Sequence, residues 1–594
     1  MHRRFVTLVR SFAAVVALAA ASAAPAADLS KVYRIAFPTA ETGFDPARVS
    51  DLYSNTVNEA IFERLLTYDY LARPAKLVPL AAEAMPQVTD NGRTYTFRIR
   101  KGIHYTPDPA FKGRKRELVA GDFAYVIKRH ADPRNRSPWA FMVEGRIAGL
   151  DDAIAQARKS GRFDYDAKIP GLETPDPYTL VIRLVAPDYL FNYTVAHVPY
   201  GAMAREVVEA YGDDIGAHPV GTGPYVLKEW KRASRIVLEA NPDFRGFTWD
   251  FAPAEPAWDD ALVQTMRGKK MPQIGRVEIS IIEEDQSRWL AFGGKELDVL
   301  ALPGTFRPQA VGADGKLLPR WTGEGVTLFK AIDPELTYTI FNFRDPVIGG
   351  FAPEKLALRR AIIMAYDVRE EIEVVRKGQA VQAHMPIPAG VVGHDPSYRT
   401  ISPYDPALAN RLLDRFGYRK GPDGWRRMPD GRPLVIRQAT QTSQIDRTFN
   451  ELWRKAMDSI AVRIEFDSGK FGDNLKAAKA CQLMMWGAAW IADYPDGDNF
   501  MQLLYGPNTG QSNNGCYESK SFDALYEKAR AMPPDAPGRN LLFLEMTRQM
   551  QVDGAWAMHV SRERNQMIRP WVLGYKKHPI LHAEWRYMDL EPRT

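Results

Sequence analysis

Short runs in the first half of the chain alternate hydrophobic with polar side chains, as half-buried β-strands do. Tyr95, Phe97 and Ile99 alternate with threonine and arginine after a turn signal at 90–92, and the run 178–184 alternates in the same way. Strands of this kind bury one face against a core and expose the other. We therefore predict that both runs belong to one antiparallel sheet.

Four further runs of mainly apolar residues predict strands: 225–230, 236–240, 434–436 and 483–490. Only a short segment separates the first two, so we expect them to pair as a hairpin. The last two lie between stretches with helical spacing. This alternation of strands and helices predicts α/β layers in the second half.

The helices of the second half are marked by spacing and by their ends. Apolar residues recur every three to four positions from Leu358 to Ala365. Asp405 and Pro406 are typical of a helix N-cap and first turn, and Gly417 is typical of a helix end. We expect the buried stripe of this second helix to be Leu408, Leu412 and Phe416.

The N-terminal segment predicts export from the cytoplasm. Three arginines precede an apolar run at 12–24 that ends in small residues, and we expect a signal peptide at 1–26. The run is too short to span a bilayer, and no cysteine stands near the expected cleavage site to accept lipid. The prediction is a soluble periplasmic protein.

Net charge and chain length bear on the protein's binding partners and on the number of its lobes. The net charge of +6 falls to +3 when the three signal arginines are removed, and no dense basic stripe interleaved with aromatics remains for nucleic acid. A chain of 594 residues exceeds what one hydrophobic core serves, so two or more lobes are expected.

Two cysteines, Cys481 and Cys516, are present. An oxidising compartment favours a disulfide between them, but two isolated buried thiols fit the sequence equally well. A zinc site is not expected, because no histidine or further cysteine stands at ligand spacing.

A series of sequence blocks runs in order through most of the mature chain. The blocks are Leu77-Val78-Pro79-Leu80-Ala81, 95–103, Ala120-Gly121-Asp122-Phe123, 219–225, Asn241-Pro242, Phe341-Asn342, 358–367, 405–418 and Ala492-Asp493-Tyr494-Pro495-Asp496. Together they resemble the periplasmic substrate-binding proteins of peptide and nickel ABC transporters, the dipeptide- and oligopeptide-binding group of solute-binding protein family 5. One block alone is weakly specific, whereas this many in order is strongly specific.

The resemblance implies a two-lobed α/β periplasmic-binding-protein fold (type II, cluster C) with an extra subdomain in the first lobe. Two chain crossings would join the lobes, the first just before Phe341 and the second at 558–569. The expected parts are lobe I at 28–74, 196–336 and 552–594, the extra subdomain at 75–195, and lobe II at 337–551. A basic insertion at 111–116 and a long connection at 247–270 depart from the family, and we expect both to be surface loops.

For the site, the resemblance assigns to Asp493 the role of holding a ligand's α-amino group. A buried ammonium needs a fixed carboxylate, and Asp493 follows the apolar run that ends at Trp490. Without the resemblance, Asp493, Asp496 and Asp498 also fit a solvated acidic loop. Their spacing does not match a calcium loop.

Other candidates surround Asp493 in the expected cleft. Trp486 and Trp490 would share one face of a strand, as walls of a side-chain pocket or as core residues, and Tyr494 follows Asp493. In similar proteins a loop containing Tyr53 and Ser54 approaches the ligand.

The segment 219–225 is rich in glycine but lacks the Gly-Lys-Ser/Thr ending of a phosphate loop. We attribute Gly221 and Gly223 to tight turns and expect Thr222 to border the cleft. On the return crossing, Arg562, Glu563 and Arg564 are typical of a solvated face; an inward Arg562 would pair with a ligand carboxylate.

The leading hypothesis is therefore an extracytoplasmic receptor that captures a peptide or peptide-like solute and delivers it to an ABC importer. It predicts no catalysis, no cofactor, no metal and a monomer whose partners are the solute and membrane permease subunits. One alternative keeps the fold with a nickel chelate, haem, an oligosaccharide or an amino-acid derivative as cargo. A secreted hydrolase is the alternative of another class, although no Gly-x-Ser-x-Gly or His-Glu-x-x-His motif is present.

Overall fold

A computed structural model describes residues 27–593; the predicted signal peptide at 1–26 lies outside the described residues. The first sheet has the order β1-β12-β9-β8, formed by Asp28–Phe37, Ile274–Ile281, Arg235–Ala240 and Tyr225–Lys231. β8 and β9 pair as the predicted antiparallel hairpin, with Tyr225 opposite Ala240. We use the name lobe I for the part of the molecule built on this sheet.

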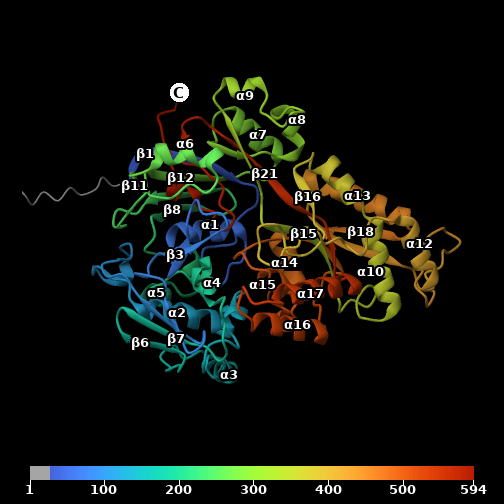
Figure 1. Cartoon of the computed structure of the whole chain (residues 1–594), viewed down its shortest axis with the longest axis horizontal. Helices are drawn as coiled ribbons and strands as arrows, with labels where there is room; N and C mark the ends of the chain where they lie inside the picture. Colours follow the sequence, from blue (N-terminus) through green and yellow to red (C-terminus); the bar gives the residue numbers. More distant parts are fainter. Residues whose placement is uncertain (1–26, 594) are drawn as a thin grey trace, which may run out of the picture.

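A second sheet, below lobe I in Figure 1, has the order β4-β5-β7-β6. Its strands are Gln87–Thr89, Thr94–Arg98, Thr179–Arg183 and Leu172–Asp176. Phe97 stands opposite Leu180 in the antiparallel pair of β5 and β7, which confirms the pairing predicted from alternation. Helix α2 (Ala120–Ala131) packs on β6 and β7.

The third sheet, the basis of lobe II, has the order β18-β17-β19-β15-β20. Its strands are Arg463–Ser468, Val435–Thr440, Met485–Ile491, Glu335–Phe341 and Trp556–Met558. The strands predicted at 434–436 and 483–490 are therefore confirmed as β17 and β19. Helices α10 (Pro353–Ala365), α13 (Gln444–Ser459), α16 (Lys520–Arg530) and α17 (Arg539–Asp553) surround it (Figure 1).

Helix α12 (Pro406–Arg415) begins and ends as predicted, because Asp405 accepts a hydrogen bond from the Leu408 amide and Gly417 has a φ of 84°. Its predicted buried stripe is confirmed in part. Leu412 and Phe416 are half-buried and pack against a hydrophobic core cluster, whereas Leu408 is 40% exposed, and the fully buried residues of the helix are Ala409 and Leu413. The face of α12 that carries Ala409 and Leu413 lies one residue beyond the predicted stripe. The helix packs on α10, and the small side chain of Ala409 permits close approach.

Two connections join the lobes. The first leads from β14 (Thr327–Ile332) to β15, and the second from β20 to β21 (Val560–Ile568). β21 pairs with β16 (Ala380–Gln382) at its start and with β13 (Val299–Ala301) and β14 towards its end. This long strand therefore runs from lobe II into lobe I, as Figure 1 shows. The exact lobe and subdomain boundaries given above stay a prediction.

The expectation that 247–270 forms a surface loop is wrong. The segment contains β10 (Phe247–Thr248) and α6 (Pro256–Met266). Trp249 is fully buried and donates its indole N–H to the Tyr587 carbonyl oxygen at 3.1 Å. Buried Asp259 pairs with Lys576 at 2.7 Å. The segment is ordered because it packs against the C-terminal part of the chain.

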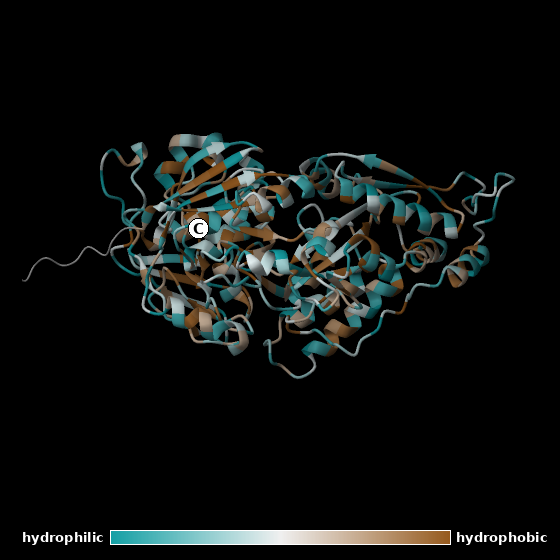
Figure 2. Cartoon of the chain, turned by 90° about the horizontal axis from the view of Figure 1, so that it is seen from above, coloured by the Kyte–Doolittle hydropathy of each residue, from teal (hydrophilic) through white to brown (hydrophobic). Residues whose placement is uncertain are grey.

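Cys481 and Cys516 form a disulfide in the structure, with their Cα atoms 6.1 Å apart. In Figure 2 the hydrophobic colours gather on the strands inside both lobes, and hydrophilic residues cover much of the outer helices. Among residues 27–593, none of the helices has the length and apolar character needed to span a bilayer.

Candidate functional site

Asp493 lies directly beyond the end of β19, held by a side chain from the short helix α15 (Asp498–Met501). The Asn499 amide N–H donates to Asp493 Oδ2 at 2.9 Å, and Asn499 Oδ1 accepts from the Asp493 backbone N–H at 2.9 Å. The same oxygen accepts from the indole N–H of Trp490 at 3.1 Å. Asn499 therefore fixes the positions of both candidate residues.

The Asp493 carboxyl is buried without a compensating charge. Its side chain is 17% exposed, and the nearest basic group within ion-pair range in the described chain is His197 Nε2 at 3.8 Å. Burial and the neighbouring Arg64 lower the pKa of His197 to about 3, so this imidazole is neutral. Burial raises the pKa of Asp493 to about 7, against the opposing hydrogen bonds.

The next two acids of this loop differ from Asp493. Asp496 receives two hydrogen bonds of 2.8 Å from the guanidinium of Arg539. Asp498 accepts the hydroxyl hydrogen of Tyr494 at 2.6 Å. Asp496 and Asp498 are 1% and 2% exposed, so the interpretation of this segment as a solvated acidic loop is wrong. Only Asp493 is left without a strong donor.

Residues from the other side of the molecule meet this loop. Tyr193 of α4 (Phe191–Ala196) stacks on Tyr494, with ring centroids 5.4 Å apart and an interplanar angle of 12°. Tyr68 at the end of β2 (Leu66–Tyr68) is buried, and its hydroxyl has no hydrogen-bond partner in the described chain. Asp493 therefore lies where lobe II contacts lobe I and its extra sheet.

Strand β19 leads to Asp493 with one open edge. β15 pairs with β19 along its whole length, whereas β17 pairs only with Met485 and Trp486. From Gly487 to Ile491 the second edge has no strand partner in the described chain. Gly487 and Ala489 are exposed, and a Cβ added at Gly487 would meet no atom within 4 Å. An extended segment can pair with such an edge.

The two tryptophans of β19 differ in burial. Trp486 is 3% exposed and packs against Phe471, with ring centroids 5.9 Å apart, so it is a core residue. Trp490 is half-buried and adjoins Asp493 through Asn499. The structure thus brings Asp493, Trp490 and Tyr494 together and places Trp486 deeper in lobe II.

Tyr53 and Ser54 lie in helix α1 (Leu52–Ile61), so their predicted location in a loop is wrong. Asp51 caps this helix by accepting the Ser54 amide hydrogen at 2.8 Å. Ser54 is fully buried, and its hydroxyl oxygen accepts from the Thr42 amide at 2.9 Å. Tyr53 packs on Phe37, with ring centroids 5.0 Å apart.

Thr222 is 1% exposed, and its hydroxyl has no partner in the described chain. The flanking glycines have a different role from the predicted one, because neither has a positive φ. A Cβ at Gly221 would stand 2.0 Å from the Ile61 carbonyl oxygen, and one at Gly223 would stand 2.6 Å from it. Close approach to the end of α1 therefore requires both glycines.

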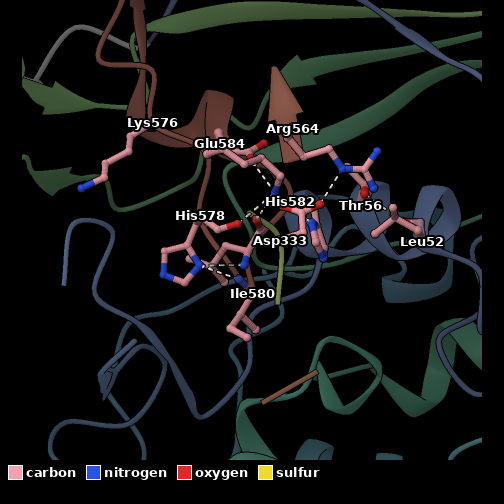
Figure 3. Close-up of polar contacts among 12 residues, drawn as sticks. Leu52, Thr56, Asp333, Arg564, Lys576, His578, Ile580, His582 and Glu584 are labelled. Atoms are coloured by element: carbon pink, nitrogen blue, oxygen red, sulfur yellow. Dashed lines mark hydrogen bonds and ion pairs between the residues drawn. The ribbon is translucent and has the colours of Figure 1, made fainter. Parts of the chain in front are cut away.

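The charged residues of the return crossing are not a solvated face. Arg562 forms a two-pronged ion pair with buried Glu335. Arg564 donates to Asp333 at 2.5 Å and to Glu335 at 3.2 Å; Figure 3 shows it directed at Asp333. Burial opposes ionisation of Glu335, but the two arginines outweigh it and lower its pKa to about 2. Arg562 already has a carboxylate partner inside the protein.

Sequence reasoning missed four residues of this region: Asn499, His197, Tyr193 and Lys479. Lys479 at the end of α14 (Phe471–Lys479) reaches Ser50 Oγ of lobe I at 3.4 Å. Burial lowers the pKa of its ammonium to about 8, and no carboxylate of the described chain opposes that shift. No sequence signal marks these residues, because tertiary contact between distant segments creates their setting.

A family model described as bacterial extracellular solute-binding proteins, family 5, matches residues 76–512, more than half of the chain. Di/tripeptide-binding protein 2 of Pseudomonas aeruginosa is 25% identical, over 96% of this chain and 97% of its own. Heme-binding protein A of Haemophilus influenzae is 24% identical, over 82% and 80%.

The fold is similar to a solved two-lobed structure. The periplasmic binding protein DppA of Helicobacter pylori, in complex with the peptide STSA, superposes with a TM-score of 0.77 at 20% identity, covering 94% of this chain and 98% of that one. In the described part of this chain, no cluster of three or more His, Cys, Asp or Glu could hold a metal ion.

Proposed function

Because the chain belongs to family 5 of the bacterial extracellular solute-binding proteins, we propose that it captures short peptides with a free α-amino group between its lobes and delivers them to an ABC importer. The protein acts in the periplasm as a monomer and leaves its cargo chemically unchanged. The names of the di/tripeptide-binding relative and of the peptide complex support this choice.

The observation that carries the proposal is the pairing of an open strand edge with an unpaired carboxylate. A peptide added along Gly487–Ile491 forms main-chain hydrogen bonds that do not depend on its sequence. Its ammonium then lies at the Asp493 end, where it neutralises a buried carboxylate that the protein leaves without a cation.

Lys479 supplies a second unpaired charge of opposite sign at the lobe contact. We assign to it the α-carboxylate of the same ligand. A zwitterion that reaches both groups removes two buried, uncompensated charges at once, which favours the closed form over the open one.

Peptide titrations of the mature protein, unfolded and refolded to remove cargo, test this function. Trialanine should bind saturably to wild type, and N-acetyl-trialanine should bind at least 100-fold more weakly because it lacks the ammonium. Asp493→Asn should reduce trialanine affinity by a similar factor. Equal affinity for both peptides would exclude the assigned role of Asp493.

Haem is the competing cargo, because a relative carries that name. A hemin titration monitored by absorbance, with trialanine as competitor, separates the two. Tight hemin binding that trialanine does not displace, with no peptide binding, would replace the peptide proposal. Accumulation of free alanine during the peptide titrations would instead support the hydrolase alternative.

A further inference from the structure

Lobe II contains a cavity of about 450 Å³ that is separate from the Asp493 region. Its walls come from the end of α10, the segments 382–384 and 399–404, and β20 with His559. None of the residues around Asp493 described above lines it. The volume is within the range of small-molecule sites in proteins.

Two residues that line this cavity carry buried polar atoms without partners in the described chain. Ser402 is 6% exposed, and its hydroxyl finds no hydrogen-bond partner in the described chain. His384 Nδ1 is also buried and unpartnered. Native structures rarely leave such groups unpaired, so a bound molecule or ion is expected to satisfy them.

The wall that carries these atoms is held in place by Gln551, which is 4% exposed. Its side-chain oxygen accepts from the Ile401 amide at 3.0 Å and from the Thr400 hydroxyl at 3.3 Å. Its side-chain N–H donates to the His384 carbonyl oxygen at 2.9 Å. Gln551 therefore ties the backbone just before Ser402 to the backbone of His384.

The charges around the cavity favour an anion. Arg399 and Arg369 line it. The one lining carboxylate, Asp367, is engaged in capping α11 (Val368–Glu370), where it accepts the Arg369 amide at 2.9 Å. Burial and the charge of Arg399 lower the pKa of His384, so its imidazole is neutral near pH 7 and can donate or accept.

The rest of the lining is mixed, and its apolar part includes Ile363, Trp556 and Met558. We propose that this cavity is a second binding site that takes a small organic carboxylate with an apolar body. The carboxylate lies at Ser402, His384 and Arg399, and the apolar body packs on Ile363, Trp556 and Met558. The site is independent of the peptide site at Asp493.

Calorimetric titration of the mature protein with phenylacetate tests the proposal. Saturable binding at one site is expected, and benzylamine, which has the same ring but a cationic group, should not bind. Arg399→Gln and Ser402→Leu should each weaken phenylacetate binding at least tenfold. Arg399 is exposed, so its variant keeps the test valid if the buried leucine disturbs folding.

Asp493→Asn is the matched control, and it should leave phenylacetate affinity within twofold of wild type. The proposal fails if phenylacetate shows no saturable binding, if benzylamine binds equally well, or if Arg399→Gln has no effect. Competition between trialanine and phenylacetate for one site would refute the independence of the two sites. Failure of the peptide proposal would leave these results unchanged.

Discussion

Asp493 and Asp496 are three residues apart in one loop, yet Asp496 has a cationic partner in the described chain and Asp493 has none. Asp496 receives both prongs of Arg539 at 2.8 Å. Asp493 receives a neutral amide at 2.9 Å and faces a neutral imidazole at 3.8 Å. A paired buried charge stabilises a fold, whereas an unpaired one costs free energy unless a partner arrives from outside. We propose that this difference separates a structural acid, Asp496, from a ligand-binding acid, Asp493.

Breaking the structural pair is expected to have the largest effect. Arg539→Met leaves Asp496 buried and uncompensated, and should lower the free energy of unfolding by about 4 kcal/mol. Denaturant unfolding measures this change. Lys528→Met, on the exposed face of α16, is the control and should stay within about 0.5 kcal/mol of wild type. Equal stability of the two variants would contradict the structural role of the pair.

The crossing between the lobes also contains a buried carboxylate paired with arginine, as Asp496 is paired with Arg539. Glu335→Gln removes the charge that Arg562 and Arg564 share, and should cost about 3 kcal/mol. The cost is below that of the Arg539 variant because these arginines are 30% and 26% exposed and water screens them.

The pH dependence of the Glu335 variant sharpens this test. The pKa of Glu335 in the folded protein, about 2, lies below its ordinary value of 4.5, so its contribution is present above pH 4.5 and is lost as pH falls through 2. Unfolding measured at pH 7 and pH 3 should show a smaller difference from wild type at pH 3. A difference that grows on acidification would be inconsistent with this pair.

Features that depend on residues close together in the sequence could be predicted, whereas features that depend on contacts between distant segments could not. The β5–β7 and β8–β9 pairings depend on local alternation, and both predictions were confirmed. The face that α12 buries depends on its fit to α10, and hydrophobicity alone selected Leu408 wrongly. The setting of Asp493 depends on His197, almost 300 residues away. No local pattern contains that information.

Asp493, the proposed binding acid, should respond to substitution in the opposite direction. Without ligand, Asp493→Asn removes an uncompensated charge and keeps a side chain that can bond to Asn499. It should raise the free energy of unfolding by about 1–3 kcal/mol at pH 8. Asp496→Asn is the matched control in the same loop and should lower it.

The pH dependence of this stability difference follows from the raised pKa of Asp493. Asp493 titrates near 7 in the folded protein against an ordinary 3.8, so wild type carries no penalty below about pH 4 and the full penalty above 7. Thermal unfolding from pH 5 to pH 8 should therefore show the Asn variant gaining on wild type as pH rises. A constant difference across this range would mean that another group sets the stability.

The smallest expected effect concerns Lys479, whose ammonium donates to the Ser50 hydroxyl of lobe I at 3.4 Å and has no other hydrogen-bond partner in the described chain. Lys479→Gln should weaken trialanine binding about tenfold, or about 1.4 kcal/mol, because the ligand carboxylate loses its cation. Binding of C-amidated trialanine should change less than twofold, because that peptide has no carboxylate to lose a partner. Equal losses for both peptides would mean that Lys479 contacts the other lobe but does not bind the ligand carboxylate. Of the two charged residues, Asp493 alone would then select the ligand.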